Sequence, residues 1–573
     1  MNALTSGFGK IRRKTARAAR KTKKLITTAA PAVVSASAAP AATAPAETPA
    51  PAEAAPAAPA PAPLYTQADA EAVFRWFREI SKIPRGSGNT KGISDYIAAF
   101  AAERGLEYRQ DELGNVLIRK AASKGAEQAP GIALQGHIDM VCEQETGRDI
   151  DMTAVGPVLM TEGDWLTADG TTLGADNGIA VAMMLALLDD REAVHPMLEC
   201  IFTVDEEIGL LGADFMDLSD LQSRQMMNLD SEQEGVFTAG CAGGAEVHVT
   251  IPVKTSHHTG IPVDVTVSGL LGGHSGEMIG RGRANADLVL ARLLYSLLEE
   301  MSFRLISMQG GNKDNAIPRS AQARILLPAD SDPDKAQQIL EEHAAKIAAE
   351  YSRTDGELSV EISAEIPADG SAPADKCTAI GRGSTRRILQ YLVVTPDGVL
   401  EYDPSFPGLP QTSLNLGVLR VDEKGMTAIY LLRSSVNSQR EALEQKIRAL
   451  AAAFEAKMVV KSAYPAWEFL TESPFRDRLI LEYERQNGEK PSVKMTHGGL
   501  ECGILSAKVE GLDCISLGPD MYGVHTPEEH LSIPSTVRVW NFLKGALQTF
   551  AGTAAETAAE PEAEPEAEAA AGR

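Results

Sequence analysis

Three short apolar runs constrain the fold most strongly, because each leads directly into a histidine or an acidic residue. The runs and the residues that follow them are 131–136 with His137, 198–204 with Asp205, and 225–229 with Asp230. A longer apolar stretch at 173–188 is typical of a buried helix, and the turn that enters it holds Asp176. Strands that alternate with helices in this way predict an α/β fold with a parallel sheet.

The polar residues at these strand ends indicate a shared site. In an open α/β sheet, ligands bind beyond the carboxyl ends of the strands, so one histidine and several carboxylates would meet at one edge. Carboxylates crowded into a partly dry site repel one another and take up protons. Divalent ions would remove that repulsion, and imidazole with carboxylate suits zinc, with manganese or cobalt as alternatives. Two ions about 3.5–4 Å apart can polarise a carbonyl and activate water together.

Each of these residues also has an ordinary structural explanation. A single carboxylate after a strand is more often a helix cap or a turn residue, and a single histidine is usually just packed. Here, however, four such motifs follow one another within 95 residues, at 136–139, 174–178, 204–207 and 228–230. Their order and spacing favour one common site over four unrelated turns.

Length and composition exclude several classes of protein. A chain of 573 residues is too long for one core, so at least two domains are expected. The sequence has no uninterrupted run of about 18 apolar residues, so no membrane span is predicted. The net charge of −24 argues against nucleic-acid binding by the body of the protein. The six cysteines form no CxxC pair, which favours free thiols in the cytoplasm over a disulfide framework.

The pattern of the sequence changes twice within the core. Strands and helices alternate up to residue 250, whereas 251–458 follows an α+β pattern, and the first pattern resumes at 459. We therefore expect a catalytic α/β domain formed by 64–250 and 459–550, with an α+β domain of 251–458 inserted into it.

Both ends of the chain are biased in composition. Residues 1–63 hold nine Lys and Arg among the first 24 and continue in Ala and Pro, while 551–573 repeat Ala, Glu and Pro. Neither end can bury enough apolar surface to offset the loss of chain entropy, so both are predicted to be disordered. The basic segment fits a solvated tail, a tether to nucleic acid or anionic lipid, or a targeting peptide, so its partner stays open.

Eight motifs of the core resemble those of the M20 metallopeptidases. They lie at 136–140, 173–178, 203–209, 228–232, 272–276, 282–286, 496–503 and 527–532. The resemblance spans 64–550 and implies a mostly parallel catalytic domain with an inserted lid domain. It also implies peptide hydrolysis by two divalent metal ions and a cis peptide bond between Asp176 and Asn177.

The resemblance implies a role for each matching residue. Five residues would bind the metal ions: His137 and Asp230 the first ion, Glu207 and His530 the second, and Asp176 both. Asp139 would orient the imidazole of His137 and fix its tautomer. Glu206 would be the general base that takes a proton from the attacking water and passes it to the leaving amine. His525, five residues before His530, competes as a ligand, but the Pro-Glu-Glu-His motif favours His530.

The lid would complete the site from the other side. The resemblance implies that His274 hydrogen-bonds the tetrahedral oxyanion of the reaction. Arg433 is a candidate for the carboxylate of the substrate, since a guanidinium binds a carboxylate with two parallel hydrogen bonds. Asn315 and the Gly498–Gly499 turn are further candidates for substrate contacts. A surface ion pair for Arg433 and a simple turn for Asn315 are the structural alternatives.

The predicted function is the metal-dependent hydrolysis of dipeptides with a free amino terminus, with broad specificity that includes Xaa-His. A free ammonium would meet the acidic residues near the metals, and closure of the lid would restrict substrate length. The alternative within the family is an N-acyl amino-acid deacylase or a carboxypeptidase. The alternative from another class is a binding or scaffold protein in which the tails are the functional parts. The oligomeric state stays open, with a homodimer as one option.

The composition of the basic extension leads to a first prediction. A chain that lacks 1–63 should fold and keep the turnover of the full chain, because that segment contributes nothing to the predicted core. Circular dichroism and kcat of the two proteins, measured side by side, check this. A truncated protein that folds but does not turn over would show that the core begins before residue 64.

Overall fold

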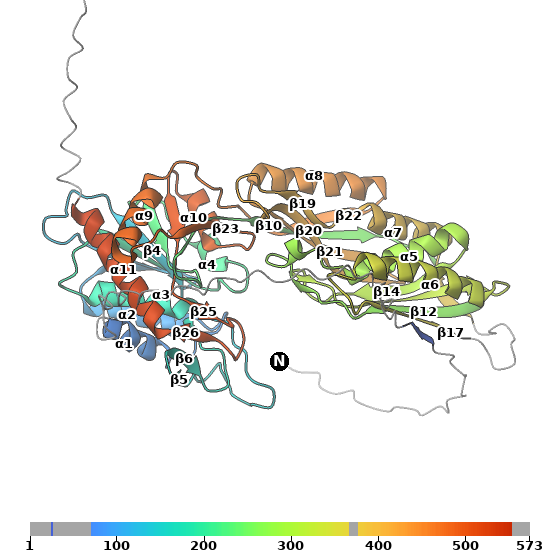
Figure 1. Ribbon diagram of the computed structural model, residues 1–573, viewed down its shortest axis with the longest axis horizontal. Helices are drawn as coiled ribbons and strands as arrows, with labels where there is room; N and C mark the ends of the chain where they lie inside the picture. Colours follow the sequence, from blue (N-terminus) through green and yellow to red (C-terminus); the bar gives the residue numbers. More distant parts are fainter. Residues whose placement is uncertain (1–23, 27–69, 366–375, 553–573) are drawn as a thin grey trace, which may run out of the picture.

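The computed structural model describes residues 24–26, 70–365 and 376–552 and shows two lobes, each with its own core (Figure 1). The first lobe is formed by 70–242 and 465–552, and most of the second by 243–464. The predicted disordered tails lie outside the described residues, except for 551–552 and the short strand β1 (Lys24–Ile26), which adds to the edge of the second lobe.

The first lobe is built on a sheet of eight strands. In spatial order they are β2 (Glu107–Gln110), β3 (Val116–Lys120), β7 (Leu198–Thr203), β4 (Ile132–His137), β8 (Gln225–Asn228), β24 (Asp513–Ser516), β9 (Val236–Cys241) and β23 (Ser492–Thr496). The helices are α1 (Glu71–Ile80), α2 (Lys91–Glu103), α3 (Ala175–Asp189), α4 (Leu211–Phe215), α9 (Pro474–Asn487), α10 (Glu501–Lys508) and α11 (Ile533–Gly552).

The centre of this sheet is parallel, as predicted. Strand β4 pairs in parallel with β7 on one side and with β8 on the other, and β8 pairs in parallel with β24. Both β4 and β7 are buried along their whole length, which explains why they read as continuous apolar runs. A smaller sheet lies beside the main one, with strands β25 (Met521–Tyr522), β26 (His530–Ser532), β6 (Trp165–Ala168) and β5 (Leu159–Glu162).

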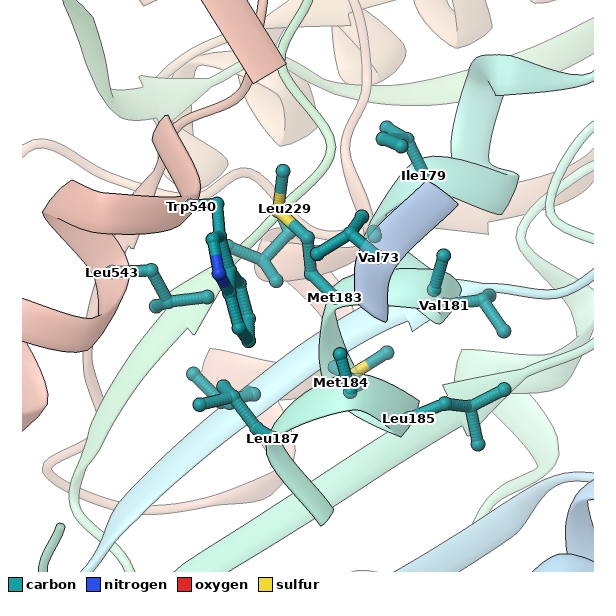
Figure 2. Packing of buried hydrophobic residues seen from close by; sticks show 14 of the residues in the cluster. Val73, Ile179, Val181, Met183, Met184, Leu185, Leu187, Leu229, Trp540 and Leu543 are labelled. Atoms are coloured by element: carbon teal, nitrogen blue, oxygen red, sulfur yellow. The ribbon is translucent and has the colours of Figure 1, made fainter. Parts of the chain in front are cut away.

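Helix α3 forms the centre of the first core. Its residues from Asn177 to Leu188 are all buried, because its surroundings are apolar on every side. Figure 2 shows Val73 of α1 beside it and Trp540 of α11 with its ring turned toward the same cluster. The predicted helix at 173–188 is therefore confirmed, and its apolar circumference explains why no amphipathic period could be seen in it.

The second lobe contains a ten-stranded antiparallel sheet covered by helices. The strands follow the order β1, β17 (Ser359–Ala364), β12 (Gly260–Ser268), β16 (Ala321–Pro328), β14 (Arg304–Gly310), β20 (Pro410–Asp422), β21 (Gly425–Ser434), β10 (Gly243–Ile251) and β22 (Lys457–Tyr464), with β19 (Gly398–Tyr402) on β20. The helices are α5 (Ala286–Glu300), α6 (Pro333–Glu350), α7 (Arg382–Val394) and α8 (Asn437–Ala453). Two small ribbons join β11 (Thr255–His258) to β18 (Cys377–Ile380), and β13 (Gly273–His274) to β15 (Ala316–Ile317).

The second sheet takes in more of the chain than the expected inserted domain of 251–458. Strand β10 begins at Gly243, and β22, which pairs with it, ends at Tyr464. The reason is that 243–251 is one continuous strand, and Val247, Val249 and Ile251 of that strand all pack into the second core. Among the described residues, no helix is both long and apolar enough to cross a membrane.

The burial of α3 generates a stability prediction. Leu185→Ala should lower the free energy of unfolding by about 2–5 kcal/mol, because Leu185 is fully buried and its removal leaves a cavity. Leu481→Ala is the matched control, since this helical leucine is 64% exposed and its loss should change stability by less than about 0.5 kcal/mol. Urea unfolding of both variants measures the difference, and equal losses would contradict the assignment of α3 to the core.

Candidate metal centre

The central strands bring their acidic and histidine ends to one edge of the first sheet. His137 is the last residue of β4, and it lies opposite Thr203, the last residue of β7, in the parallel ladder. Glu206 and Glu207 lie in the loop after β7, which ends at Thr203, and Asp230 lies two residues after the end of β8. The parallel pairing therefore gathers at one edge the residues that the sequence placed at three separate strand ends.

Asp176 reaches the same edge from the first turn of α3. The helix is entered through Gly174, whose φ of 68° lies in the left-handed region that glycine adopts readily. Asp176 itself has non-helical backbone angles, and its peptide bond to Asn177 is cis, as the family resemblance implies. This backbone points the carboxylate of Asp176 back toward the strand ends.

Two groups of donor atoms share the carboxylate of Asp176. In the first group, Nε2 of His137 lies 3.1 Å from Oδ1 of Asp176 and 3.5 Å from Oδ1 of Asp230. In the second group, Nε2 of His525 lies 3.2 Å from Oδ2 of Asp176 and 3.0 Å from Oε1 of Glu207. Each carboxylate oxygen of Asp176 thus faces a different histidine.

These donor sets fit divalent cations. Ligand atoms at about 2.0–2.2 Å from a tetrahedral zinc ion stand about 3.3–3.6 Å apart, close to the spacings in both groups. Each group combines an imidazole with two carboxylates, a donor set typical of zinc or manganese. These residues could therefore hold two ions, with Asp176 as the ligand common to both.

Asp139 fixes the orientation of His137. The Nδ1–H of His137 donates to the backbone oxygen of Asp139 at 3.2 Å and lies 3.4 Å from its Oδ1, which leaves Nε2 directed at the two aspartates. The carboxylate of Asp139 also accepts hydrogen bonds from Ser87 and from the backbone N–H groups of Glu206 and Glu207. One buried carboxylate thus links the end of β4 to the loop after β7.

The carboxyl groups of the site shift one another's pKa values. Burial raises the pKa of Glu206 well above its usual value, and the negative charges of Asp230, Glu207 and Glu501 add to this shift. Burial likewise raises the pKa of Asp230. Hydrogen bonds to Asp176 and Glu207 raise the pKa of His525 to about 11. Such crowding of acids is what positive ions would relieve.

The structure does not bring one predicted ligand to the donor groups. His530 lies outside both donor groups: its ring packs against Trp165 and Tyr522, with ring centroids 4.8 and 5.6 Å apart, and its Nδ1–H donates to the backbone oxygen of Glu528. The cause is the pairing of β26 with β25, which places His530 opposite Tyr522 on the small sheet.

His525 takes the place predicted for His530. It lies in the loop between β25 and β26, with a φ of 64°, a conformation that residues other than glycine adopt rarely and mostly at functional sites. This backbone turns its ring toward Asp176 and Glu207. The sequence offered both histidines, but their spacing alone could not show which of them the hairpin pairing removes from the site.

The candidate substrate residues of the second lobe lie around Gly276. A Cβ atom built on Gly276 would come within 2.9 Å of the His274 ring and 3.4 Å of the guanidinium carbon of Arg433, so both side chains surround this glycine. Burial lowers the pKa of His274, and the positive charges of Arg433 and His525 lower it further. Asn315 is joined to this region because its backbone oxygen accepts a hydrogen bond from Ser275.

Arg433 lies in a row of side chains that runs across the second sheet. In the register of the strands it stands opposite Ser413 on one side and Gly244 on the other, and Gly244 stands opposite Tyr464. The bare Gly244 leaves room for the Tyr464 ring, whose hydroxyl accepts a hydrogen bond from Nη1 of Arg433 at 3.1 Å. Gly499 of the Gly498–Gly499 turn lies against the other side of that ring.

Sequence reasoning missed several buried charged residues behind the site. The guanidinium of Arg85 donates to the backbone oxygens of Ile138, Asp139 and Gly174, which belong to the turns of both His137 and Asp176. The carboxylates of Glu501 and Glu529 are buried as well. Glu501 and Glu529 lie within two of the motifs and Arg85 lies outside all of them, but a charged residue in a sequence carries no sign that it will be buried.

Comparison with known proteins agrees with this arrangement. A profile of "Peptidase family M20/M25/M40" matches residues 133–549, and the chain belongs to this family. It is 33% identical over 490 residues to the cytosol non-specific dipeptidase of Escherichia coli strain K12, covering 84% of this chain and 98% of the relative. It is also 24% identical over 340 residues to the uncharacterized protein YqjE of Bacillus subtilis strain 168, covering 55% and 85% of the two chains.

The fold has a solved relative of the same extent. The structure of aminoacylhistidine dipeptidase from Vibrio alginolyticus matches with a TM-score of 0.73 and 32% identity, covering 83% of this chain and 96% of that chain. Profile, sequence and structure thus cover nearly the whole of both lobes, and the M20 resemblance of the motifs is confirmed.

The assignment of His525 to the second donor group, in place of His530, can be tested directly. His525→Ala should weaken the binding of one ion per chain by more than about tenfold, because it removes a ligand of the second donor group. His530→Ala is the control, and it should leave metal content unchanged. Elemental analysis after dialysis against limiting zinc measures both, and the opposite result would restore His530 as the ligand.

Proposed function

We propose that this chain is a dinuclear metallo-dipeptidase of the M20 family that hydrolyses dipeptides with a free amino terminus. The observation that carries this proposal is the pair of donor groups that share Asp176, with the half-buried Glu206 beside them. The relatives that match most of the chain are named dipeptidases, which supports the same substrate class. His137, Asp176 and Asp230 would hold one ion, and Asp176, Glu207 and His525 the other.

The metals and the acid–base group have separate tasks. When bound, the two ions would supply Lewis-acid polarisation of the peptide carbonyl and lower the pKa of the attacking water. Glu206 would accept the proton of that water at its carboxylate and transfer it to the nitrogen of the leaving amine. His137, Glu206 and Glu207 offer atoms within 4.8 Å of one another, so Glu206 is near enough for this exchange without belonging to either shared donor group.

The second lobe would hold the substrate and its transition state. Arg433 is almost fully buried, and its Nε has no hydrogen-bond partner among the described residues. Its Nη1 donates to the hydroxyl of Tyr464 and not to a carboxylate. A buried guanidinium without an acidic partner suits the terminal carboxylate of a dipeptide. His274, on the same side of the site, would donate a hydrogen bond to the oxyanion as it develops. Asn315 and the Gly498–Gly499 turn would make further contacts with the substrate.

Zinc is the metal that we propose, with manganese or cobalt able to occupy the same donors. We also propose the cytoplasm as the location of the protein, because its Escherichia coli relative is named a cytosol dipeptidase and none of the six cysteines forms a disulfide.

A substrate panel tests the proposed reaction. Metal-stripped protein is assayed with zinc, manganese or cobalt on free dipeptides, N-acetylated dipeptides and longer peptides. The proposal predicts metal-dependent hydrolysis of the free dipeptides alone. Hydrolysis of the N-acetylated compounds would indicate a deacylase instead, and release of single residues from longer peptides would indicate a carboxypeptidase.

The assigned base gives a sharper prediction. Glu206→Gln should lower kcat by about 100- to 10,000-fold, because the amide cannot take up the proton of the attacking water. Metal content should stay at the wild-type level, since Glu206 lies outside the two shared donor groups. The kcat and the metal content are measured on the same preparation. Near-normal turnover with both ions bound would refute Glu206 as the base.

A further inference from the structure

Glu529 is a buried carboxylate that contacts the backbone of Asp176 and has no part in the proposed reaction. Its side chain is 98% buried in the first lobe, and it lies four residues after the candidate ligand His525. Its carboxylate accepts four backbone hydrogen bonds, from the N–H groups of Leu173, Gly174, Ala175 and Asp176, at 2.8, 2.9, 2.8 and 3.3 Å.

Two of these N–H groups, those of Ala175 and Asp176, belong to the start of helix α3, where the first N–H groups have no partner within the helix. The other two lie on the turn that leads into the helix. Helix α3 begins at Ala175 inside the protein, where Ala175 and Leu173 are fully buried, so water cannot serve these donors. A carboxylate is favoured at this position because the helix start also carries partial positive charge. Glu529 therefore determines where the turn that bears Asp176 lies.

The same turn is held from its other side. Arg85 donates to the backbone oxygen of Gly174 and also to those of Ile138 and Asp139. Glu529 thus binds the N–H groups of the turn and Arg85 binds a carbonyl group of it. Through Arg85, the turn of Asp176 is tied to the loop that orients His137.

Glu529 also determines where the loop of His525 lies. The backbone N–H of Glu529 donates to the oxygen of Thr526 at 3.1 Å, so 526–529 form a closed turn directly after His525. A carboxylate anchored on α3 therefore fixes this turn close to Asp176. One side chain thereby sets the separation of two ligands that come from parts of the chain about 350 residues apart.

We propose that Glu529 is a positioning residue that holds Asp176 and His525 at the separation that binding of both metal ions requires. This inference rests on the proposed function, because it assumes that these residues bind metal. Since Asp176 belongs to both donor groups, loss of the anchor should weaken both ions together, unlike loss of His525, which belongs to one group only.

The test compares Glu529→Gln with Glu528→Gln. Glu528 is the adjacent, exposed glutamate. Its variant therefore makes the same chemical change without removing the hydrogen bonds to 173–176. Zn²⁺ is titrated into the metal-free proteins in competition with a chromophoric chelator. We expect the Glu529→Gln variant to bind both ions about 10- to 100-fold more weakly, the usual effect of removing a group that orients metal ligands. The Glu528→Gln variant should match wild type.

Amide hydrogen exchange of the metal-free proteins is the second measurement. Exchange at 173–176 should be faster in Glu529→Gln, and exchange in α2 should be unchanged. If Glu529→Gln does not fold, Glu529→Asp replaces it, which keeps the charge but shortens the reach to the turn. Failure of both variants to fold would mean that Glu529 serves only the stability of the lobe, and the proposal would be overturned.

The outcomes separate this inference from the proposed function. A folded Glu529→Gln variant that binds both ions as tightly as wild type overturns the positioning role alone. Weakening of one ion only would also overturn it, because Asp176 would then keep its place. Wild-type protein that takes up no Zn²⁺ would overturn the proposed function itself.

Discussion

The carboxylate of Asp176 is the point on which the structure of the site depends. Its two oxygens face two histidines, His137 at 3.1 Å and His525 at 3.2 Å, which are far apart in the sequence. Several carboxyl groups can share so small a space only if positive charge is present among them, which metal ions would supply. The fold serves this arrangement by bringing parallel strand ends and the start of a buried helix to one edge.

In the proposed function, the two lobes would contribute different chemistry to one site. The first lobe supplies the metal donors and Glu206 from elements held rigidly by the core around α3. The second lobe would supply His274 from the ribbon of β13 and β15 and the buried Arg433 from its large antiparallel sheet. The Nε of Arg433 has no hydrogen-bond partner among the described residues. Tyr464, on the strand that leads back to the first lobe, contacts Arg433 and Gly499 and so joins the candidate substrate residues of both lobes.

Much of this could be predicted from the sequence, and the reasons are physical. Buried parallel strands are continuous apolar runs, so β4 and β7 could be recognised, and the residues after them had to meet at one edge. The choice between His525 and His530 depended on the register of a short hairpin, which no local pattern encodes. The anchors Arg85 and Glu529 are charged residues whose burial becomes visible only when contacts between distant segments are known.

Anomalous X-ray diffraction from crystals grown with Zn²⁺ tests the central claim most directly. We expect two zinc peaks about 3.5–4 Å apart, with one oxygen of Asp176 on each and the His525 ring on the second. A single peak, or a second ion bound by His530 with Asp176 turned away, would contradict it.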